Sequence, residues 1–305
     1  MAVLATSGIT LPKNIAAGMF KKAATGSAIA ALSNSEPQQF GEVSYMTLTG
    51  RPKAELVGEG ANKADTNATF GTKVATPHKF QVTMRFNEEV QWADEDYQMG
   101  VLQTLADEGG LALSRALDLG AFHGINPLAG TAAASIVVGD RIATTTNSVE
   151  IVTATLTTPD TVLEQAAGLI IADGYVPNGI AFDPSYSWTI ATARYADGRK
   201  KYPELGFGAT VTSFEGLPAF SSSTVSGLPE ASADTNVKAI IGQWDAFRWG
   251  VQRDIPVEVI KYGDPDGLGD LKRKNQIALR AEVVYGWAVM DLDAFATVKD
   301  AVANV

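Results

Sequence analysis

The sequence predicts a mixed α+β protein, with a β-rich part and a compact α/β part, from three observations. Residues 80–86 alternate apolar and polar side chains, which is the period of a strand with one buried face. Residues 92–122 instead repeat apolar side chains at three- and four-residue steps, which is the period of a long helix. Residues 136–249 then alternate strand-like and helix-like segments, the order typical of an α/β unit.

The composition is that of a globular chain. The 305 residues are 46% hydrophobic and 19% charged, which is enough apolar material for a core. No apolar run approaches the roughly 18 residues that a spanning helix needs, and the N-terminus shows no apolar signal core. We therefore expect a soluble protein, made and kept in a cytoplasm, with no membrane partner.

The first 35 residues are predicted to form an arm. They are rich in Ala, Ser and Gly, with a candidate short helix at 14–24, and they carry Lys13, Lys21 and Lys22 but no acidic residue. The whole chain has a net charge of −10, which argues against binding phosphate backbones over its whole surface. The basic arm is either a solvated tail or a contact that faces DNA or a partner.

A polar excursion at 55–74 separates the strand at 80–86 from a weaker strand at 42–50. If residues 50–75 form two extended arms of about 13 residues each, the hairpin reaches about 40 Å at roughly 3.3 Å per residue. An isolated ribbon is marginally stable in water, so we predict that it lies across another copy of the chain. A long surface loop is the alternative. The predicted contact residues are Lys53, Glu55, Glu59, Lys63, Asp65 and Phe70.

The long helical pattern contains Gly109 and Gly110 near its middle, which indicates a bend, a close backbone contact or a break into two helices. Two shorter helices follow. One begins at Thr158-Pro159-Asp160 and ends at Gly174, and the other begins at Asp183-Pro184 and ends near Gly198, because Pro suits the first helical position.

The remaining segments are predicted mainly as strands. Residues 179–183 form a short buried strand, and 251–262 and 276–290 contain strands separated by a turn at 264–270. A short helix near 292–298 is expected to close the chain.

No pattern of catalytic, cofactor-binding or metal-binding residues emerges. The chain has no Cys, which excludes thiolate chemistry and Cys-based metal sites. His78 and His123 have no second ligand at metal-binding spacing, and we interpret them as ordinary loop or helix-end residues. The glycine-rich 58–63 lacks the P-loop ending, and the acidic 264–270 lacks two calcium ligands.

Taken in order, several segments resemble the major capsid proteins of tailed phages with the Hong Kong 97 shell fold. AELVGEGANKADTNATF, FQVTMRFNEEV and ALDLGAFHG are similar to that family's extended loop and spine helix. NGIAFDPSYSWTIATARYADGRKKYPELG and FEGLPAFSSSTV resemble its axial domain. IIGQWDAFRWGVQRDIPVEVI and NQIALRAEVVYGWAVMDLDAFATV resemble its closing peripheral strands.

The resemblance implies a domain order: an N-terminal arm at 1–35, a first peripheral part at 36–135 with the extended loop at 50–75 and the spine helix at 92–122, an axial domain at 136–249, and a second peripheral part at 250–305. It also implies a virion shell of pentamers and hexamers that is assembled in the host cytoplasm. The shell encloses double-stranded DNA, which it contacts without sequence recognition. A portal is a further partner implied, with either a separate scaffold protein or none, and a decoration protein is left open. Contacts within a capsomer are assigned to Arg194, Arg199, Lys200 and Lys201.

Other functions remain open on the sequence. An encapsulin-type nanocompartment shell shares the fold but encloses protein cargo. An α/β enzyme with an inserted hairpin would need a pocket with convergent titratable groups, which the shortage of His and Cys disfavours. An elongated adhesin or tail component is disfavoured by the α/β alternation.

Overall fold

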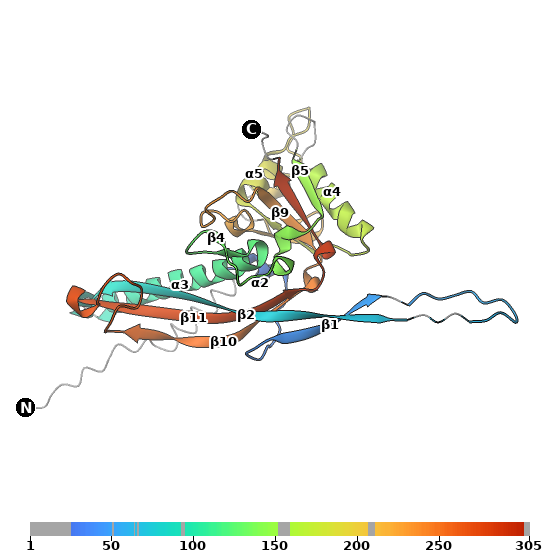
Figure 1. The fold of residues 1–305 in the computed structure, drawn as a ribbon. Helices are drawn as coiled ribbons and strands as arrows, with labels where there is room; N and C mark the ends of the chain where they lie inside the picture. The colour runs from blue at the N-terminus through green and yellow to red at the C-terminus, as the bar shows by residue number, and fades with distance from the viewer. Residues whose placement is uncertain are drawn as a thin grey trace, which may run out of the picture.

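The computed structural model describes residues 26–50, 52–63, 65, 67–92, 95–151, 159–206 and 211–301. An elongated base, built on a four-stranded sheet, carries an α/β head, and a long hairpin projects from one end of the base (Figure 1). The head contains the second, six-stranded sheet.

The base sheet has the order β1-β2-β11-β10 and is antiparallel throughout. Its strands are β1 (Val43–Gly50), β2 (Thr69–Asn87), β10 (Phe247–Ile260) and β11 (Gln276–Val289). Pairing of β2 with β11 runs from Asn87↔Gln276 to Thr76↔Trp287, so the alternating segment 80–86 lies inside the sheet as predicted. The part of β2 before Thr76 pairs with β1 instead.

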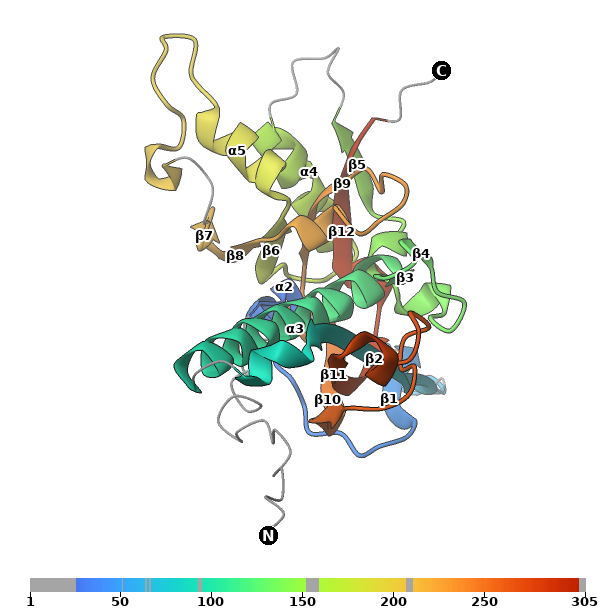
Figure 2. The ribbon, with the colours of Figure 1, turned by 90° about the vertical axis from the view of Figure 1, so that its left-hand side faces the viewer.

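Helix α3 (Glu95–His123) lies between the base sheet and the head (Figures 1 and 2). The short 3-10 helix η1 (Glu88–Trp92) precedes it. The helix runs through Gly109 and Gly110 without interruption, so the alternative of two helices is wrong; both glycines are buried. Leu113 and Leu117 pack in a core that joins the helix to both layers.

The head sheet has the order β5-β12-β9-β6-β8-β7. Its strands are β5 (Ser148–Ile151), β6 (Gly179–Phe182), β7 (Ser213–Phe214), β8 (Leu217–Ser221), β9 (Val237–Gly242) and β12 (Phe295–Asp300). Helices α4 (Pro159–Ala172) and α5 (Pro184–Thr192) pack on it (Figure 1). A small sheet of β3 (Ile125–Asn126) and β4 (Thr131–Ala132) follows α3.

The two predicted helix starts in the head are confirmed in part. Asp183 caps α5, because its carboxylate accepts a hydrogen bond from the Ser185 backbone N–H at 2.8 Å and Pro184 opens the helix. Helix α4 begins at Pro159 and is followed by Gly174 at a φ of +87°; Thr158 lies outside the described residues. The end of α5 differs from the expectation, since it stops at Thr192 and not near Gly198.

The expected closing helix at 292–298 is wrong. Only Leu292–Ala294 form a 3-10 turn, and Phe295–Asp300 form β12 between β5 and β9. Phe295, Ala296, Thr297 and Val298 are all buried, so the strand shows no apolar–polar alternation that the sequence could reveal. Consequently the C-terminal strand belongs to the head sheet, although residues 250–305 were expected to lie together in the base.

Residues 26–35 do not form an arm. Helix α2 (Ala28–Leu32) inserts between α3 and the head, with Ser27, Ala28 and Ile29 fully buried. The buried carboxylate of Asp118 on α3 accepts hydrogen bonds from the backbone N–H groups of Ala28 (2.9 Å) and Ile29 (3.2 Å) and from the hydroxyls of Ser27 and Thr224. The candidate helix at 14–24 and Lys13, Lys21 and Lys22 lie outside the described residues.

Candidate intersubunit contact sites

The projecting hairpin has a paired root and an unpaired tip. In the root, β1 pairs with β2 from Val43↔Ala75 to Gly50↔Thr69. The described residues between 52 and 68 belong to no strand, and a hydrogen bond from the Ala61 N–H to the Gly58 carbonyl (3.1 Å) closes their turn. The long hairpin was predicted, with extended arms over residues 50–75. Its paired ladder instead lies nearer the base, because strand-forming side chains are concentrated in β1.

One face of the root is apolar and exposed. Residues paired across the ladder share a face, which places Leu48 beside Phe70 and Met46 beside Thr72. The exposed fractions of Met46, Leu48 and Phe70 are 78%, 48% and 65%. Ser44 and Val74 complete this face, which carries no charged side chain. We call these six residues the ribbon face. Large exposed apolar groups on an elongated projection are typical of a protein–protein contact.

The charged residues predicted for the contact lie along the tip. Lys53, Glu55, Glu59, Lys63 and Asp65 are all exposed, as is Phe70 at the root. Leu56, also in the tip, is fully exposed. Sequence reasoning singled out Phe70 but missed Met46 and Leu48, whose spacing of two was the available signal.

The basic residues predicted for capsomer contacts lie on one small hairpin of the head. The Tyr195 N–H donates to the Arg199 carbonyl and the Lys201 N–H to the Ala193 carbonyl, each at 2.9 Å. This hairpin replaces the expected last turns of α5.

Most of these basic side chains are held by the hairpin itself or by the turn that follows it. Arg194 donates to the Gly198 carbonyl (2.8 Å), Arg199 to the Asp197 carboxylate (2.6 Å) and Lys200 to the Gly206 carbonyl (2.8 Å). Arg199 also lies over the Tyr195 ring, 5.9 Å from its centroid. The hairpin thereby presents guanidinium groups in ordered positions.

Lys201 differs from the other three, because its ammonium pairs with the buried carboxylate of Asp160 in the first turn of α4. The Tyr202 hydroxyl donates to the same carboxylate at 2.9 Å. Burial, together with the Asp160 charge, raises the pKa of Tyr202, so the phenol stays protonated. Lys201 therefore anchors the hairpin to the head.

The head exposes several large apolar side chains that the sequence did not indicate as contacts. Ile171 and Val176, at and beyond the end of α4, are 61% and 71% exposed. Leu169 on α4 and Trp188 on α5 are also exposed. In Figure 2 both helices lie in the upper part of the head, away from the base sheet.

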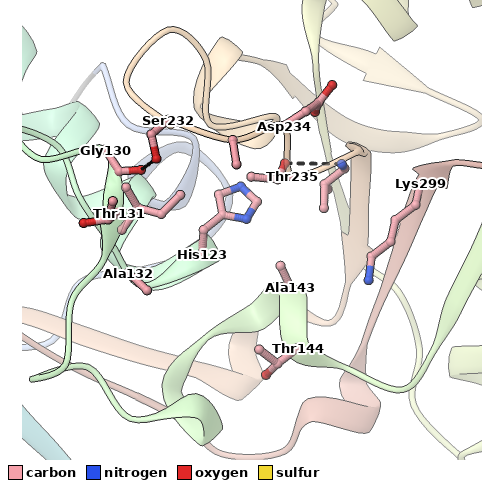
Figure 3. A pocket seen from close by; sticks show the side chains of 13 residues that line it. His123, Gly130, Thr131, Ala132, Ala143, Thr144, Ser232, Asp234, Thr235 and Lys299 are labelled. Carbon is pink, nitrogen blue, oxygen red and sulfur yellow. Dashed lines mark hydrogen bonds between the residues drawn. The ribbon is translucent and has the colours of Figure 1, made fainter. Parts of the chain in front are cut away.

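The described residues include a cavity of about 430 Å³ between the end of α3, the β3–β4 hairpin and β12 (Figure 3). His123, Asp234 and Lys299 are among its lining residues. Burial lowers the pKa of His123 to about 4, so the ring is neutral near pH 7, and its Nε2 lies 2.9 Å from the Val225 carbonyl. A neutral imidazole bound to a backbone carbonyl is a structural arrangement, as expected for a helix-end residue.

His78 does not lie in a loop or at a helix end, because it is part of β2. It is buried, its Nε2 is 3.0 Å from the Thr76 hydroxyl, and its ring centroid lies 4.2 Å from that of Trp287. Burial lowers the pKa of His78. Across the described ranges, no group of three or more His, Asp or Glu residues is placed to hold a metal ion.

The acidic segment 264–270 forms a turn, as predicted. Arg85 on β2 closes it, with Nη2 donating to Asp264 at 3.0 Å and Nε to Asp266 at 2.7 Å. The hydrogen bond from Arg85 lowers the pKa of Asp266. None of the helices described here is long and apolar enough to cross a membrane.

Exposed apolar groups on the projecting hairpin and the head, with no metal-holding cluster among the described residues, are typical of a structural subunit. The family model for the phage capsid family matches residues 7–300. A solved structure from Mycobacterium phage Ogopogo is 52% identical, with a TM-score of 0.83, covering 90% of this chain and 92% of that one. One from Gordonia phage Cozz is 36% identical, with a TM-score of 0.77 and coverage of 90% and 87%.

A structure described as the capsid of an empty GTA particle, computed with C5 symmetry, has the same fold at 14% identity, with a TM-score of 0.60 and coverage of 91% and 90%. No curated protein matches the chain. The chain belongs to the phage capsid family, and its function is that of a major capsid protein, a structural component of the virion shell that assembles with its own copies. The resemblance to phage capsid proteins inferred from the sequence is confirmed, and the nanocompartment alternative is not favoured.

Proposed function

We propose that the chain forms the pentamers and hexamers of an icosahedral Hong Kong 97-like shell that encloses double-stranded DNA, with the hairpin lying across a neighbouring copy. The supporting observation is the ribbon face. Met46, Leu48 and Phe70 expose large apolar side chains on a ribbon that projects beyond its own base (Figure 1). A two-stranded ribbon is marginal in water unless its apolar face is covered, and a second copy is the surface that a shell supplies.

The base and head fit the peripheral and axial domains of such a shell. The base carries the long sheet and α3, and the head carries the hairpin with Arg194, Arg199 and Lys200 on its outer side. We assign contacts within a capsomer to this hairpin and to the apolar surface of α4. Rings of copies close only where the rotation between heterologous contacts fits, and each stable contact buries more than about 1,000 Å².

The remaining partners follow from the same proposal. Assembly takes place in the host cytoplasm, with a portal, a separate scaffold protein and a decoration protein as partners. The shell contacts only the phosphate backbone of the DNA. We assign this contact to the basic segment with Lys13, Lys21 and Lys22.

Replacing residues 51–68 by an Asn-Gly turn tests the part of the contact that the tip makes, because it removes the charged side chains of the tip and keeps the ribbon face. This change keeps every ladder pair between β1 and β2, because Gly50 and Thr69 then flank a two-residue turn. The subunit is expected to fold with an unchanged melting temperature but to form no closed shells in electron micrographs. Shells of normal size and yield would contradict the proposed role of the hairpin.

A further inference from the structure

The segment between α2 and β1 crosses the base sheet. Near its start it bonds to one edge strand, since the Glu36 N–H donates to the Trp249 carbonyl of β10 at 2.8 Å. Its end leads into β1, which is the opposite edge in the order β1-β2-β11-β10. We call residues 36–42 the strap. Tyr285 and Trp287 face α3, so Gly286 between them faces the other side of the sheet, where the strap lies.

A pair of glycines makes room for the strap. Gly250 on β10 and Gly286 on β11 are direct partners in the ladder. A Cβ atom on Gly250 would lie under 3.0 Å from the Glu36 carbonyl oxygen, and one on Gly286 would lie equally close to the side-chain amides of Gln38 and Gln252. The two glycines therefore form a notch in the face of the sheet. A side chain at either position would fill this notch.

Two glutamines fill the notch and tie the strap to both edges of the sheet. The buried Gln252 on β10 donates to the Gln38 side chain (3.1 Å) and the Gly41 carbonyl (2.9 Å), and accepts from the Gly41 N–H (3.2 Å). Gln38 in turn donates to the Tyr45 hydroxyl on β1 at 3.0 Å. At the other end, Glu36 forms an ion pair with Arg248 of β10.

Apart from the strap, the root of the hairpin is joined to the rest of the base sheet through the continuous strand β2. Residues 69–75 of β2 pair with β1 alone, and pairing with β11 begins only at Thr76. With about 15 residues in each arm at about 3.3 Å per residue, a swing of about 10° at the root would move the tip by about 9 Å. A displacement of that size would take the tip off any specific contact.

We propose that the strap is a positioning joint, in which Gln38, Gln252 and the Gly250–Gly286 notch fix the direction in which the hairpin leaves the sheet. Its consequence for assembly rests on the proposed contact of the hairpin with a neighbouring copy. The joint itself is a property of the single subunit, because every hydrogen bond in it lies within one chain.

The test uses hydrogen exchange on the unassembled full-length subunit. Gln252→Ala removes the bonds to Gln38 and Gly41, and we expect amides in 43–50 and 69–75 to exchange at least tenfold faster, while those of β9 and β12 keep their rates. Gly286→Ala should act in the same direction, because its methyl group displaces both amides. Gly168→Ala is the matched control, since an added Cβ there meets nothing within 4 Å.

Tyr45→Phe provides a milder variant, because it removes only the hydroxyl that links β1 to the strap. We expect a smaller acceleration confined to the same amides. The proposal would be contradicted if Gln252→Ala and Gly286→Ala left exchange at the root unchanged. It would also be contradicted if they accelerated exchange in β9 and β12 as much as at the root.

Particle size is the second measurement. Gln252→Ala subunits that fold normally should give particles of mixed diameter in electron micrographs, because the tips no longer reach one position. Uniform particles of normal diameter, despite faster exchange at the root, would refute the positioning role. Suppose that the Asn-Gly replacement of 51–68 left shells normal while Gln252→Ala still accelerated exchange at the root. The proposed contact of the hairpin would then be wrong, and the proposal that the strap is a positioning joint would be retained.

Discussion

The head sheet and the hairpin root are both β-structure, but they place their apolar side chains in opposite environments. In the head, β12 between β5 and β9 buries Phe295, Ala296 and Val298 completely. In the root, Met46, Leu48 and Phe70 remain exposed on one face of a two-stranded ribbon. The head is thus stabilised by its own chain, whereas none of the described residues covers the ribbon face, and the two regions should respond differently to the same loss of apolar surface.

The largest expected effect on subunit stability is in the head. Phe295→Ala removes a fully buried ring that packs edge-on against Trp244, and we expect the free energy of unfolding to fall by about 3–5 kcal/mol. Urea unfolding of the unassembled subunit, followed by tryptophan fluorescence, measures this change. A loss under about 1 kcal/mol would show that the head tolerates the cavity and would weaken the comparison.

Loss of the Asp118 carboxylate should be the next largest effect. Asp118→Ala leaves buried donors of Ala28, Ile29 and Thr224 without their acceptor, and we expect unfolding to become easier by about 3 kcal/mol. The matched control is Glu108→Ala, an exposed position on the same helix. Equal melting temperatures for the two variants would contradict the role of Asp118 in holding α2.

Stability should fall with pH below 6.5 through His123. Its pKa is about 4 in the folded subunit and 6.5 in the unfolded chain, so the unfolded chain binds the additional proton between these values. The stability that the neutral His123 ring contributes is fully present above pH 6.5, and about 2 kcal/mol of this stability is lost by pH 5.

The measurement for His123 is a comparison with His123→Gln, which cannot titrate. Urea unfolding at pH 7 and pH 5 should show a larger loss for the unmodified chain than for the variant. Equal losses would mean that the imidazole is not held neutral by burial.

The smallest effect on stability is expected at the ribbon face. Leu48→Thr combined with Phe70→Thr keeps β-forming residues at exposed positions, so unfolding should change by less than about 0.5 kcal/mol. Assembly is nevertheless expected to be lost, as measured by sedimentation of the particles. Thr72→Ser on the same face is the control and should assemble normally. Normal shells from the double variant would remove the distinction between the two regions.

Several local features could be predicted because their signals lie in adjacent residues. The alternation at 80–86 indicated a half-buried strand, Asp183-Pro184 indicated a helix start, and the glycines of 264–270 indicated a turn. Each depends on backbone preferences that act over a few residues.

The other features depend on residues far apart in the sequence. Strand β12 was taken for a helix because burial on both faces removes alternation. The ribbon face was missed because Met46 and Leu48 are joined to Phe70 only by the ladder of the root, which pairs residues on either side of the long tip. The notch at Gly250 and Gly286 likewise requires knowledge of the pairing between two strands and of the strap that crosses them.

The most direct measurement is a cryo-electron microscopy map of the assembled particle at side-chain resolution. The account predicts that Met46, Leu48 and Phe70 lie against a neighbouring copy, with their exposed surface covered. A map in which closed shells form while this face points into solvent would contradict it.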